Sequence, residues 1–299
     1  MTILNESKTQ FKPAQEQIST PVDETLHSAN CGLLVHRVGR IRNEFRAEAR
    51  EFARMLQMAF NKVLHPNATT FLYEELFGDD AAFHWIVHMK APNDYAGFIR
   101  ASDHDTGVRQ TVEEDRLPKK GGGNWERMFE EGSFREKVMC PQHGIVRIED
   151  KSALVGLFVP PARFQTATPP DKLLHSGNAD VIILRTSQVR YEFREEARRF
   201  GHEWQEYINR KFPGDVTILL YEEIWGQQDR IYWMMHLRSL DDYGKILALA
   251  EQDDDYRQLF AKERASHNGK GTWARMFVDG STRDTVLVPH HSGMGIGWR

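Results

Sequence analysis

The amino-acid sequence repeats itself at one fixed offset, and this constrains the fold more than any other feature. When residues 33–143 are aligned with residues 181–291, 37 of the 111 positions are identical and no gap is needed. The shared positions include Tyr73-Glu74-Glu75 with Tyr221-Glu222-Glu223, Trp85 with Trp233, His88 with His236 and Trp125 with Trp273. Similarity at a fixed period indicates repeated structural units. We therefore expect two copies of one small domain that arose by duplication.

The repeat also sets the expected domain boundaries. Residues 1–25 are polar and lack the apolar stretch of a signal peptide, so we expect a flexible lead-in. The first repeat then covers residues 26–145 and the second covers residues 173–299. The Pro-containing segment 146–172 is expected to link them.

Each repeat shows the same order of expected elements. In the first repeat, a short apolar run at 33–38 predicts a strand, and apolar residues at helical spacing from 41 to 60 predict an amphipathic helix. Two strands then flank a Gly-containing turn, a second helix begins near Asn93, and a last strand lies near 135–139. The order β-α-β-β-α-β is the split β-α-β arrangement of ferredoxin-like folds.

A ferredoxin-like sheet carries helices on one face only, so its other face must be covered by something else. Two such units placed face to face would form a shared barrel. We therefore expect an α+β fold with two tandem ferredoxin-like domains packed as an intramolecular pseudo-dimeric α/β barrel. On this element order and duplication, residues 31–140 and 179–288 resemble the dimeric α/β-barrel superfamily.

Composition excludes several classes of protein. The chain has 39 Lys+Arg against 43 Asp+Glu, so it lacks the basic excess typical of nucleic-acid binders. No apolar run is long enough to span a membrane. Cys31 and Cys140 are too few for a disulfide framework. We expect a cytoplasmic protein with a small-molecule substrate and neither nucleic-acid nor membrane partners; the sequence is also compatible with a homodimer.

The third strand of each repeat suggests a site inside the barrel, because side chains alternate between the two faces of a strand. One face is apolar and should lie under the helices. The other face should point into the barrel; it carries His84, Ile86, His88 and Lys90 in the first repeat and Tyr232, Met234, His236 and Arg238 in the second. His88 or His236 is the expected general base, since histidine titrates near neutral pH. A hydrogen-bonded structural role is the alternative.

The two repeats differ where His84 in the first is replaced by Tyr232 in the second. This difference makes the first repeat the candidate for a specialised pocket, with His84 as a catalytic candidate. An exposed strand end that has drifted in sequence explains the difference equally well. His84 and His88 would lie about 13 Å apart, so they cannot chelate one metal ion alone.

Tyrosine and tryptophan residues supply the remaining site candidates. Tyr73 and Tyr221 could polarise a substrate oxygen, together with Lys90 and Arg238, although the neighbouring acids are more simply solvated or paired with Arg. Trp125 and Trp273 show helical spacing with Met and Phe. They should be core residues or, alternatively, an aromatic wall over a pocket.

The segment Leu-His-Ser-X-Asn precedes the first strand of each repeat, with Ser28 in one copy and Ser176 in the other. A Ser and a His suggest a nucleophile pair, but neither an Asp nor an oxyanion arrangement accompanies them. Turns closed by Asn and Ser side chains explain the segment more simply.

The superfamily resemblance implies an enzyme that acts on a small, largely apolar substrate, aromatic or polyketide-like. The implied reaction is cofactor-independent monooxygenation or cyclisation in a biosynthetic pathway, with no metal and no cofactor. Two alternatives stay open. One is a heme oxidoreductase, which needs an axial ligand such as His. The other is a non-catalytic small-molecule binding protein.

Overall fold

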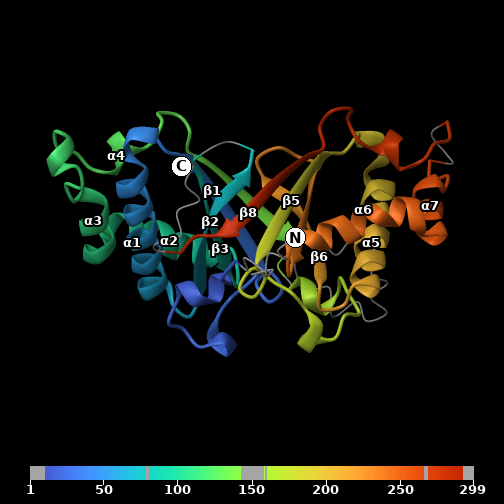
Figure 1. Ribbon diagram of the computed structural model, residues 1–299, viewed down its shortest axis with the longest axis horizontal. Helices are drawn as coiled ribbons and strands as arrows, with labels where there is room; N and C mark the ends of the chain where they lie inside the picture. Colours follow the sequence, from blue (N-terminus) through green and yellow to red (C-terminus); the bar gives the residue numbers. More distant parts are fainter. Residues whose placement is uncertain (1–10, 79–80, 143–157, 159, 266–268, 292–299) are drawn as a thin grey trace, which may run out of the picture.

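The computed structural model describes residues 11–78, 81–142, 158, 160–265 and 269–291. Eight strands form a closed barrel in which every neighbouring pair is antiparallel, in the order β1-β3-β2-β8-β5-β7-β6-β4 (Figure 1). The strands are β1 (Leu33–Arg40), β2 (Ala68–Phe77), β3 (Ala82–Met89), β4 (Arg135–Pro141), β5 (Val181–Gln188), β6 (Val216–Trp225), β7 (Arg230–Leu237) and β8 (Arg283–Pro289). The predicted α+β barrel is confirmed.

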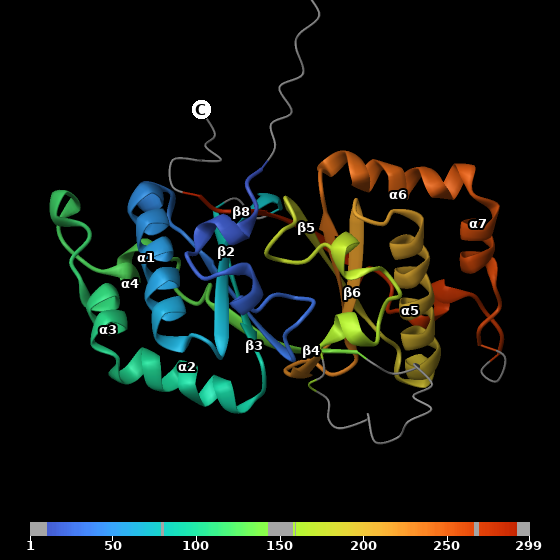
Figure 2. The ribbon, with the colours of Figure 1, turned by 90° about the horizontal axis from the view of Figure 1, so that it is seen from below.

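Helices flank the barrel on two opposite sides, as Figures 1 and 2 show. The first half carries α1 (Arg46–Leu64), α2 (Asn93–His104), α3 (Thr106–Glu113) and α4 (Trp125–Met128). The second half carries α5 (Arg194–Lys211), α6 (Leu240–Gln252) and α7 (Asp254–Ala261). One helix was expected directly after the third strand of each half, but two consecutive helices are present there, α2 and α3 in the first half and α6 and α7 in the second. Asp105 and Asp253 explain this, since each carboxylate caps the N-terminus of a new helix.

Each half forms a four-stranded sheet, β4-β1-β3-β2 in the first and β8-β5-β7-β6 in the second. The two sheets join edge to edge, because β2 pairs with β8 and β4 pairs with β6. A closed barrel leaves none of these strand edges unpaired. Each half therefore completes the sheet of the other half.

The sheet separates two kinds of core. On its outer face, Trp85 and Val87 of β3 pack under α1 and its neighbours. On its inner face, Ile86 and Met234 belong to an apolar cluster that fills the middle of the barrel. The predicted faces of these strand residues agree with the structure, and an eight-stranded barrel is just wide enough for its interior to be filled by side chains.

Lys90 and Arg238 depart from the expectation that they point into the barrel. Both follow the last residue of their strands, β3 and β7, and both are exposed. The Arg238 guanidinium donates to the carbonyl oxygen of Asn178 at 3.3 Å. The alternation stops with the strand, so these two cations lie at the barrel end in contact with solvent.

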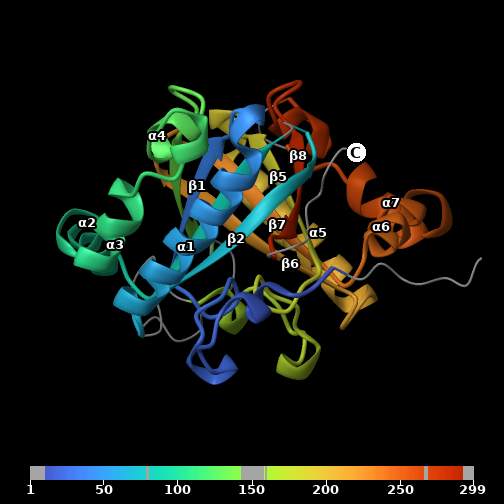
Figure 3. The ribbon, with the colours of Figure 1, turned by 60° about the vertical axis from the view of Figure 1, so that its left-hand side comes forward.

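In the described part of the N-terminal segment, residues 11–25, a glutamine side chain is bonded to the barrel. Gln17 is buried; its side-chain amide donates to the carbonyl oxygen of Leu72 on β2 and accepts from the Leu72 backbone N–H. Gln165, which lies 148 positions later, makes the same pair of bonds to Leu220 on β6. Of the expected linker 146–172, residues 146–157 and 159 lie outside the described residues. Figure 3 shows the segments before β1 and before β5 side by side at one end of the barrel.

Two sequence-level exclusions can be compared with the structure. Among the described helices, none has the length and apolar character needed to cross a membrane. Cys31 and Cys140 are both free and buried, so they form no disulfide. Burial raises the pKa of the Cys140 thiol to about 12, so this residue is a protonated, inert side chain at neutral pH.

Candidate ligand pocket and the buried histidines

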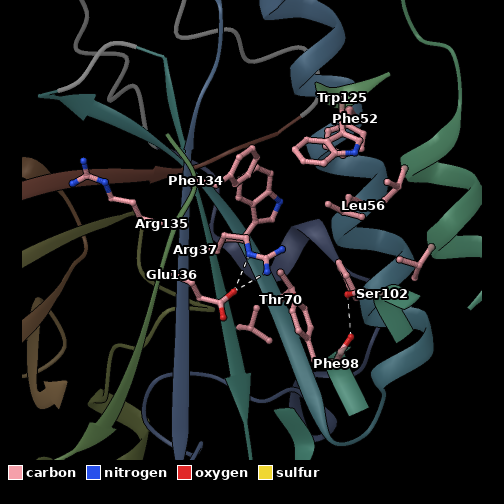
Figure 4. A pocket seen from close by; sticks show the side chains of 15 residues that line it. Arg37, Phe52, Leu56, Thr70, Phe98, Ser102, Trp125, Phe134, Arg135 and Glu136 are labelled. Atoms are coloured by element: carbon pink, nitrogen blue, oxygen red, sulfur yellow. Dashed lines mark hydrogen bonds and ion pairs between the residues drawn. The ribbon is translucent and has the colours of Figure 1, made fainter. Parts of the chain in front are cut away.

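A cavity of about 480 Å³ lies in the first half, between the outer face of the sheet and the helices α1, α2 and α3 (Figure 4). Its walls are mostly aromatic and aliphatic: Phe52, Leu56, Phe60, Trp85, Val87, Phe98, Val108, Val112, Trp125 and Phe134, with Arg37, Thr70, Ser102, Arg135 and Glu136 as polar members. A concave, mainly apolar space with few polar groups is typical of a small-molecule site.

The charged groups of this pocket neutralise one another. Nε and Nη2 of Arg37 lie 2.9 and 2.8 Å from Oε2 of Glu136, and the Tyr95 hydroxyl donates to Oε1 of the same carboxylate. Partial burial, together with Glu136, raises the pKa of Tyr95 to about 12. The guanidinium of Arg37 also lies over the Phe98 ring, 5.4 Å from its centroid. Arg135 points away from the cavity in Figure 4.

Thr70 contributes a polar group that has no hydrogen-bond partner among the described residues. The residue is 1% exposed, and its hydroxyl oxygen bonds to none of the side chains or backbone groups that the structure describes. Thr70 is a pocket-lining residue on β2 and is drawn at the cavity in Figure 4. A buried hydroxyl without a partner costs about 1–3 kcal/mol, and a hydrogen bond from a ligand that reaches it would remove this cost.

An aromatic wall closes the upper part of the pocket. The Trp125 ring stacks on Phe52 with centroids 6.3 Å apart and an interplanar angle of 10°. Phe134 contacts both Trp125 and the backbone of β1. A Cβ at Gly39 would come within 2.8 Å of the Phe134 ring, so glycine at this position lets the ring lie against the strand.

In the second half, larger aromatic side chains take two of the equivalent positions. Leu56 is replaced by Trp204 and Val108 by Tyr256, and the Trp204 indole N–H donates to the Tyr256 hydroxyl at 3.1 Å. Both aromatic residues belong to the buried core of that half. Thr70 is replaced by Ile218, so the unpaired hydroxyl is also missing from the second half.

The expected bases His88 and His236 lie on the other side of the sheet, inside the barrel. Each is fully buried, and each bonds to a serine that precedes the first strand of the opposite half. His88 Nε2 lies 2.8 Å from the Ser176 hydroxyl, and His236 Nε2 lies 2.8 Å from the Ser28 hydroxyl. The two serines also exchange bonds, because each backbone N–H donates to the other hydroxyl oxygen at 2.9 Å.

The partners of these imidazoles define their protonation. Nδ1 of His88 lies 3.1 Å from the carbonyl oxygen of Thr69, and Nδ1 of His236 lies 3.0 Å from that of Thr217. A carbonyl only accepts, so Nδ1 carries the proton and Nε2 accepts from the serine hydroxyl. Burial lowers the pKa of both histidines to about 3. Both rings are therefore neutral near pH 7 with every nitrogen bonded.

Tyr73 and Tyr221 belong to the same interior network. Their hydroxyls donate to the carbonyl oxygens of Ser176 and Ser28 at 2.7 and 2.5 Å. Burial raises the pKa of both tyrosines well above the usual value, so both stay protonated. The expected Asn-closed turns are also present, since Asn30 and Asn178 each accept the backbone N–H three residues earlier.

The other predicted site residues are spread over several places. Trp125 lines the pocket, whereas Trp273 packs into the core of the second half. Ile86 and Met234 lie in the interior apolar cluster. His84 and Tyr232 lie near the barrel end opposite Ser28 and Ser176.

Sequence reasoning missed the pocket residues Thr70, Arg37 and Glu136. Arg37 and Glu136 align with Arg185 and Asp284, which carry the same charges. A comparison of the two repeats therefore does not single out these residues. The sequence did carry one signal for the pocket, which was the difference in side-chain size between aligned positions of the two repeats. At these positions a large aromatic residue in one repeat aligns with a smaller aliphatic residue in the other.

The pocket does not fit heme. None of the described residues that line it is His, Cys, Met or Tyr, the side chains that serve as axial ligands. Within the described part of the chain, no group of three or more His, Cys, Asp or Glu side chains could hold a metal ion.

The closed barrel of two four-stranded sheets places this chain in the dimeric α/β-barrel class. The chain belongs to DUF6039, a family of unknown function, because the model of this family matches residues 4–295. No curated protein matches the sequence.

Solved structures that are similar to this chain include the following three. One is a proposed monooxygenase from Fusobacterium nucleatum, with 11% identity and a TM-score of 0.49, covering 89% of this chain and 93% of its own. Another is an anthrone oxidase-like protein, with 12% identity, a TM-score of 0.48 and coverages of 89% and 94%. The third is chlorite dismutase from Candidatus Nitrospira defluvii, with 12% identity, a TM-score of 0.44 and coverages of 87% and 92%.

Proposed function

We propose that this chain is an enzyme for a small, largely apolar substrate, of the cofactor-independent monooxygenase or cyclase type, and that the substrate binds in the first-half pocket. The observation that carries the proposal is the Thr70 hydroxyl, buried without a protein partner in a pocket with apolar walls. A flat aromatic or polyketide-like molecule would lie between the aromatic side chains. One of its oxygens would bond to Thr70.

The proposal includes an origin by duplication of a ferredoxin-like unit. Its support is the gap-free repeat in the sequence and the matching strand orders of the two halves. The first half would have kept a ligand space, while the second half became a filled scaffold. One ligand per chain is therefore expected rather than two.

A second candidate, a non-catalytic binding protein, is favoured by the charges of the pocket. Arg37 and Glu136 satisfy each other, so among the described lining residues no unpaired acid or base faces the space. General base roles for His88 and His236 stay predictions. In our proposal these residues position the loops that carry Ser28 and Ser176.

The test is a screen of planar aromatic ketones and phenols by quenching of tryptophan fluorescence, because Trp85 and Trp125 line the pocket. Ligands that bind are then incubated with isotopically labelled dioxygen, and the products are analysed by mass spectrometry. Label in the product supports a monooxygenase, and an unlabelled rearranged product supports a cyclase. Binding at one site without turnover supports the binding protein, and absence of any binding to the wild type contradicts both proposals.

A further inference from the structure

The guanidinium of Arg37 has two kinds of contact surface in the first-half pocket. Its edge bonds to Glu136, with Nε and Nη2 at 2.9 and 2.8 Å from Oε2. Its flat side lies over the Phe98 ring, with Cζ 5.4 Å from the ring centroid. A guanidinium is planar and stacks on aromatic rings while its edge holds a carboxylate. Arg37 lines the cavity and its side chain is 35% exposed, so this group is open to a ligand.

The second half shows what a ring does beside the equivalent guanidinium. Arg185 aligns with Arg37, and its Nη2 lies 2.7 Å from Oδ2 of Asp284. Cζ of Arg185 lies over the Trp204 ring, 5.4 Å from the centroid. The Trp204 ring also packs against Trp233 in a T-shaped contact, with centroids 5.8 Å apart and an interplanar angle of 83°. An indole is thus held between a cation and an aromatic neighbour.

Both contacts of this indole have counterparts in the first half. Arg37 is opposite Trp85 in the pairing of β1 with β3. Arg185 and Trp233 have the same relation in the pairing of β5 with β7. Arg37 and Trp85 line the cavity of about 480 Å³, and Leu56 takes the sequence position of the indole. The first half therefore keeps the two groups that hold an indole but lacks the indole itself.

Charge and polarity limit the kind of ring that suits this place. Arg37 and Glu136 together carry no net charge, so the pair does not favour an anionic ligand over a neutral one. The attraction that remains acts between the guanidinium and the negative face of an aromatic ring, and it grows with the electron density of the ring. The Trp204 N–H donates to Tyr256, whereas the aligned Val108 offers no acceptor, so the ligand should present carbon on that side.

We propose that Arg37 determines the specificity of the pocket, and that its ligand is an electron-rich aromatic ring system, bicyclic or larger, stacked on the guanidinium. The ligand would lie as the Trp204 indole lies against Arg185. This inference rests on the proposed function, because it concerns the same pocket. It narrows the substrate class to hydroxylated or otherwise electron-rich aromatic compounds and disfavours electron-poor rings such as quinones.

The test compares indole with 4,5,6,7-tetrafluoroindole by isothermal titration calorimetry. The two molecules have similar shapes, but fluorine withdraws electron density from the ring face. Fluorine also makes the N–H a stronger donor, so a weaker affinity would not come from a weaker hydrogen bond. We expect the wild type to bind indole about tenfold more tightly than the fluorinated ring.

A pair of double variants tests whether Arg37 causes this preference. Arg37→Gln with Glu136→Gln removes the cation without leaving a carboxylate unpaired, so the preference for indole should disappear. Arg185→Gln with Asp284→Asn is the matched control. It should keep the preference, because the protein's own Trp204 covers that guanidinium.

Leu56→Trp places the indole of the second half into the pocket and should abolish the binding of both ligands. Thermal unfolding checks the fold of every variant, and if the Arg37 double variant does not fold, the wild-type preference and Leu56→Trp decide. The proposal is overturned by equal affinities in the wild type, by a preference that survives without Arg37, or by binding retained in Leu56→Trp.

The outcomes also separate this inference from the proposed function. Equal affinities that are lost together in Leu56→Trp would overturn the inference and leave the substrate pocket supported. If neither indole binds, the inference fails, and the screen of ketones and phenols decides on the proposed function by itself.

Discussion

Leu56 and Val108 leave a cavity under the helices of the first half, whereas Trp204 and Tyr256 occupy the same positions in the second half. The two halves nevertheless share their strand order and their histidine–serine contacts. The backbone plan is thus independent of whether the space over the sheet is filled. In our proposal, the first half holds the ligand and the second half is the scaffold.

The largest expected effect is a loss of stability at acid pH, and it tests the histidine–serine contacts that the two halves share. His88 and His236 have folded-state pKa values of about 3, below the usual value of 6.5, so the unfolded chain binds more protons between these limits. Stability is therefore full above pH 6.5 and falls as the pH drops towards 3. Each imidazole contributes about 1.4 kcal/mol per pH unit, or about 5 kcal/mol for both between pH 6.5 and 4.5.

Urea unfolding at a series of pH values measures this dependence. His88→Gln and His236→Gln should each remove about 2.5 kcal/mol of this dependence between pH 6.5 and 4.5, because the two contacts are equivalent. The remainder comes from other histidines whose pKa burial lowers, which are His27, His36 and His175. Unequal losses would show that the halves differ here as well.

The next prediction concerns substitutions that remove aromatic side chains from the core of the second half. The double variant Trp204→Leu with Tyr256→Val copies the first half and should lower the free energy of unfolding by about 4 kcal/mol, because it removes buried aromatic volume. Urea unfolding measures this cost. Binding stoichiometry then shows whether a second site has opened; an unchanged stability would mean that the second half is not the filled scaffold described above.

The reverse exchange fills the first half. Leu56→Trp with Val108→Tyr should weaken ligand binding by about 100-fold, or about 2.7 kcal/mol, since the pocket volume is lost. Titration of the best ligand from the fluorescence screen measures the affinity, and circular dichroism checks the fold. Full affinity in a folded variant would place the ligand elsewhere.

The smallest expected effect concerns Thr70. Thr70→Val removes a hydroxyl that has no protein partner, so the stability of the free protein should stay the same or rise by about 1 kcal/mol, while ligand affinity falls about tenfold. Thr217→Val is the matched control, because that hydroxyl accepts from the backbone N–H of Leu174 at 2.8 Å. The control should lose about 1–2 kcal/mol of stability and keep the affinity.

The sequence was sufficient for the barrel, because the repeat, the period-2 strands and the helical stripes all indicate the same architecture. The inward face of Ile86 and Met234 followed from alternation alone. Lys90 and Arg238 did not follow it, since alternation says nothing about where a strand ends. The bonds of His88 to Ser176 and of His236 to Ser28 join residues of opposite halves, which a pattern within one repeat does not reveal.

The pocket could not be predicted from sequence patterns either, because no residue type or spacing marks the position of a cavity. It arises from several modest differences in side-chain size that are spread from α1 to α3. Helical spacing predicted core positions for Trp125 and Trp273, and both are partly buried. Only packing shows that Trp125 borders a cavity while Trp273 packs against the core of the second half.

The edge-to-edge pairing of β2 with β8 and of β4 with β6 has a consequence for synthesis on the ribosome. The first half ends with β4 at Pro141; β6 begins 75 residues later and β8 ends 148 residues later, the latter corresponding to roughly 7 to 30 seconds of elongation. Until then the edge of β4 waits for β6 and the edge of β2 waits for β8, and unpaired edges favour aggregation. Since β8 is the last strand of the barrel to emerge, the edge of β2 stays unpaired until the second half has been synthesised.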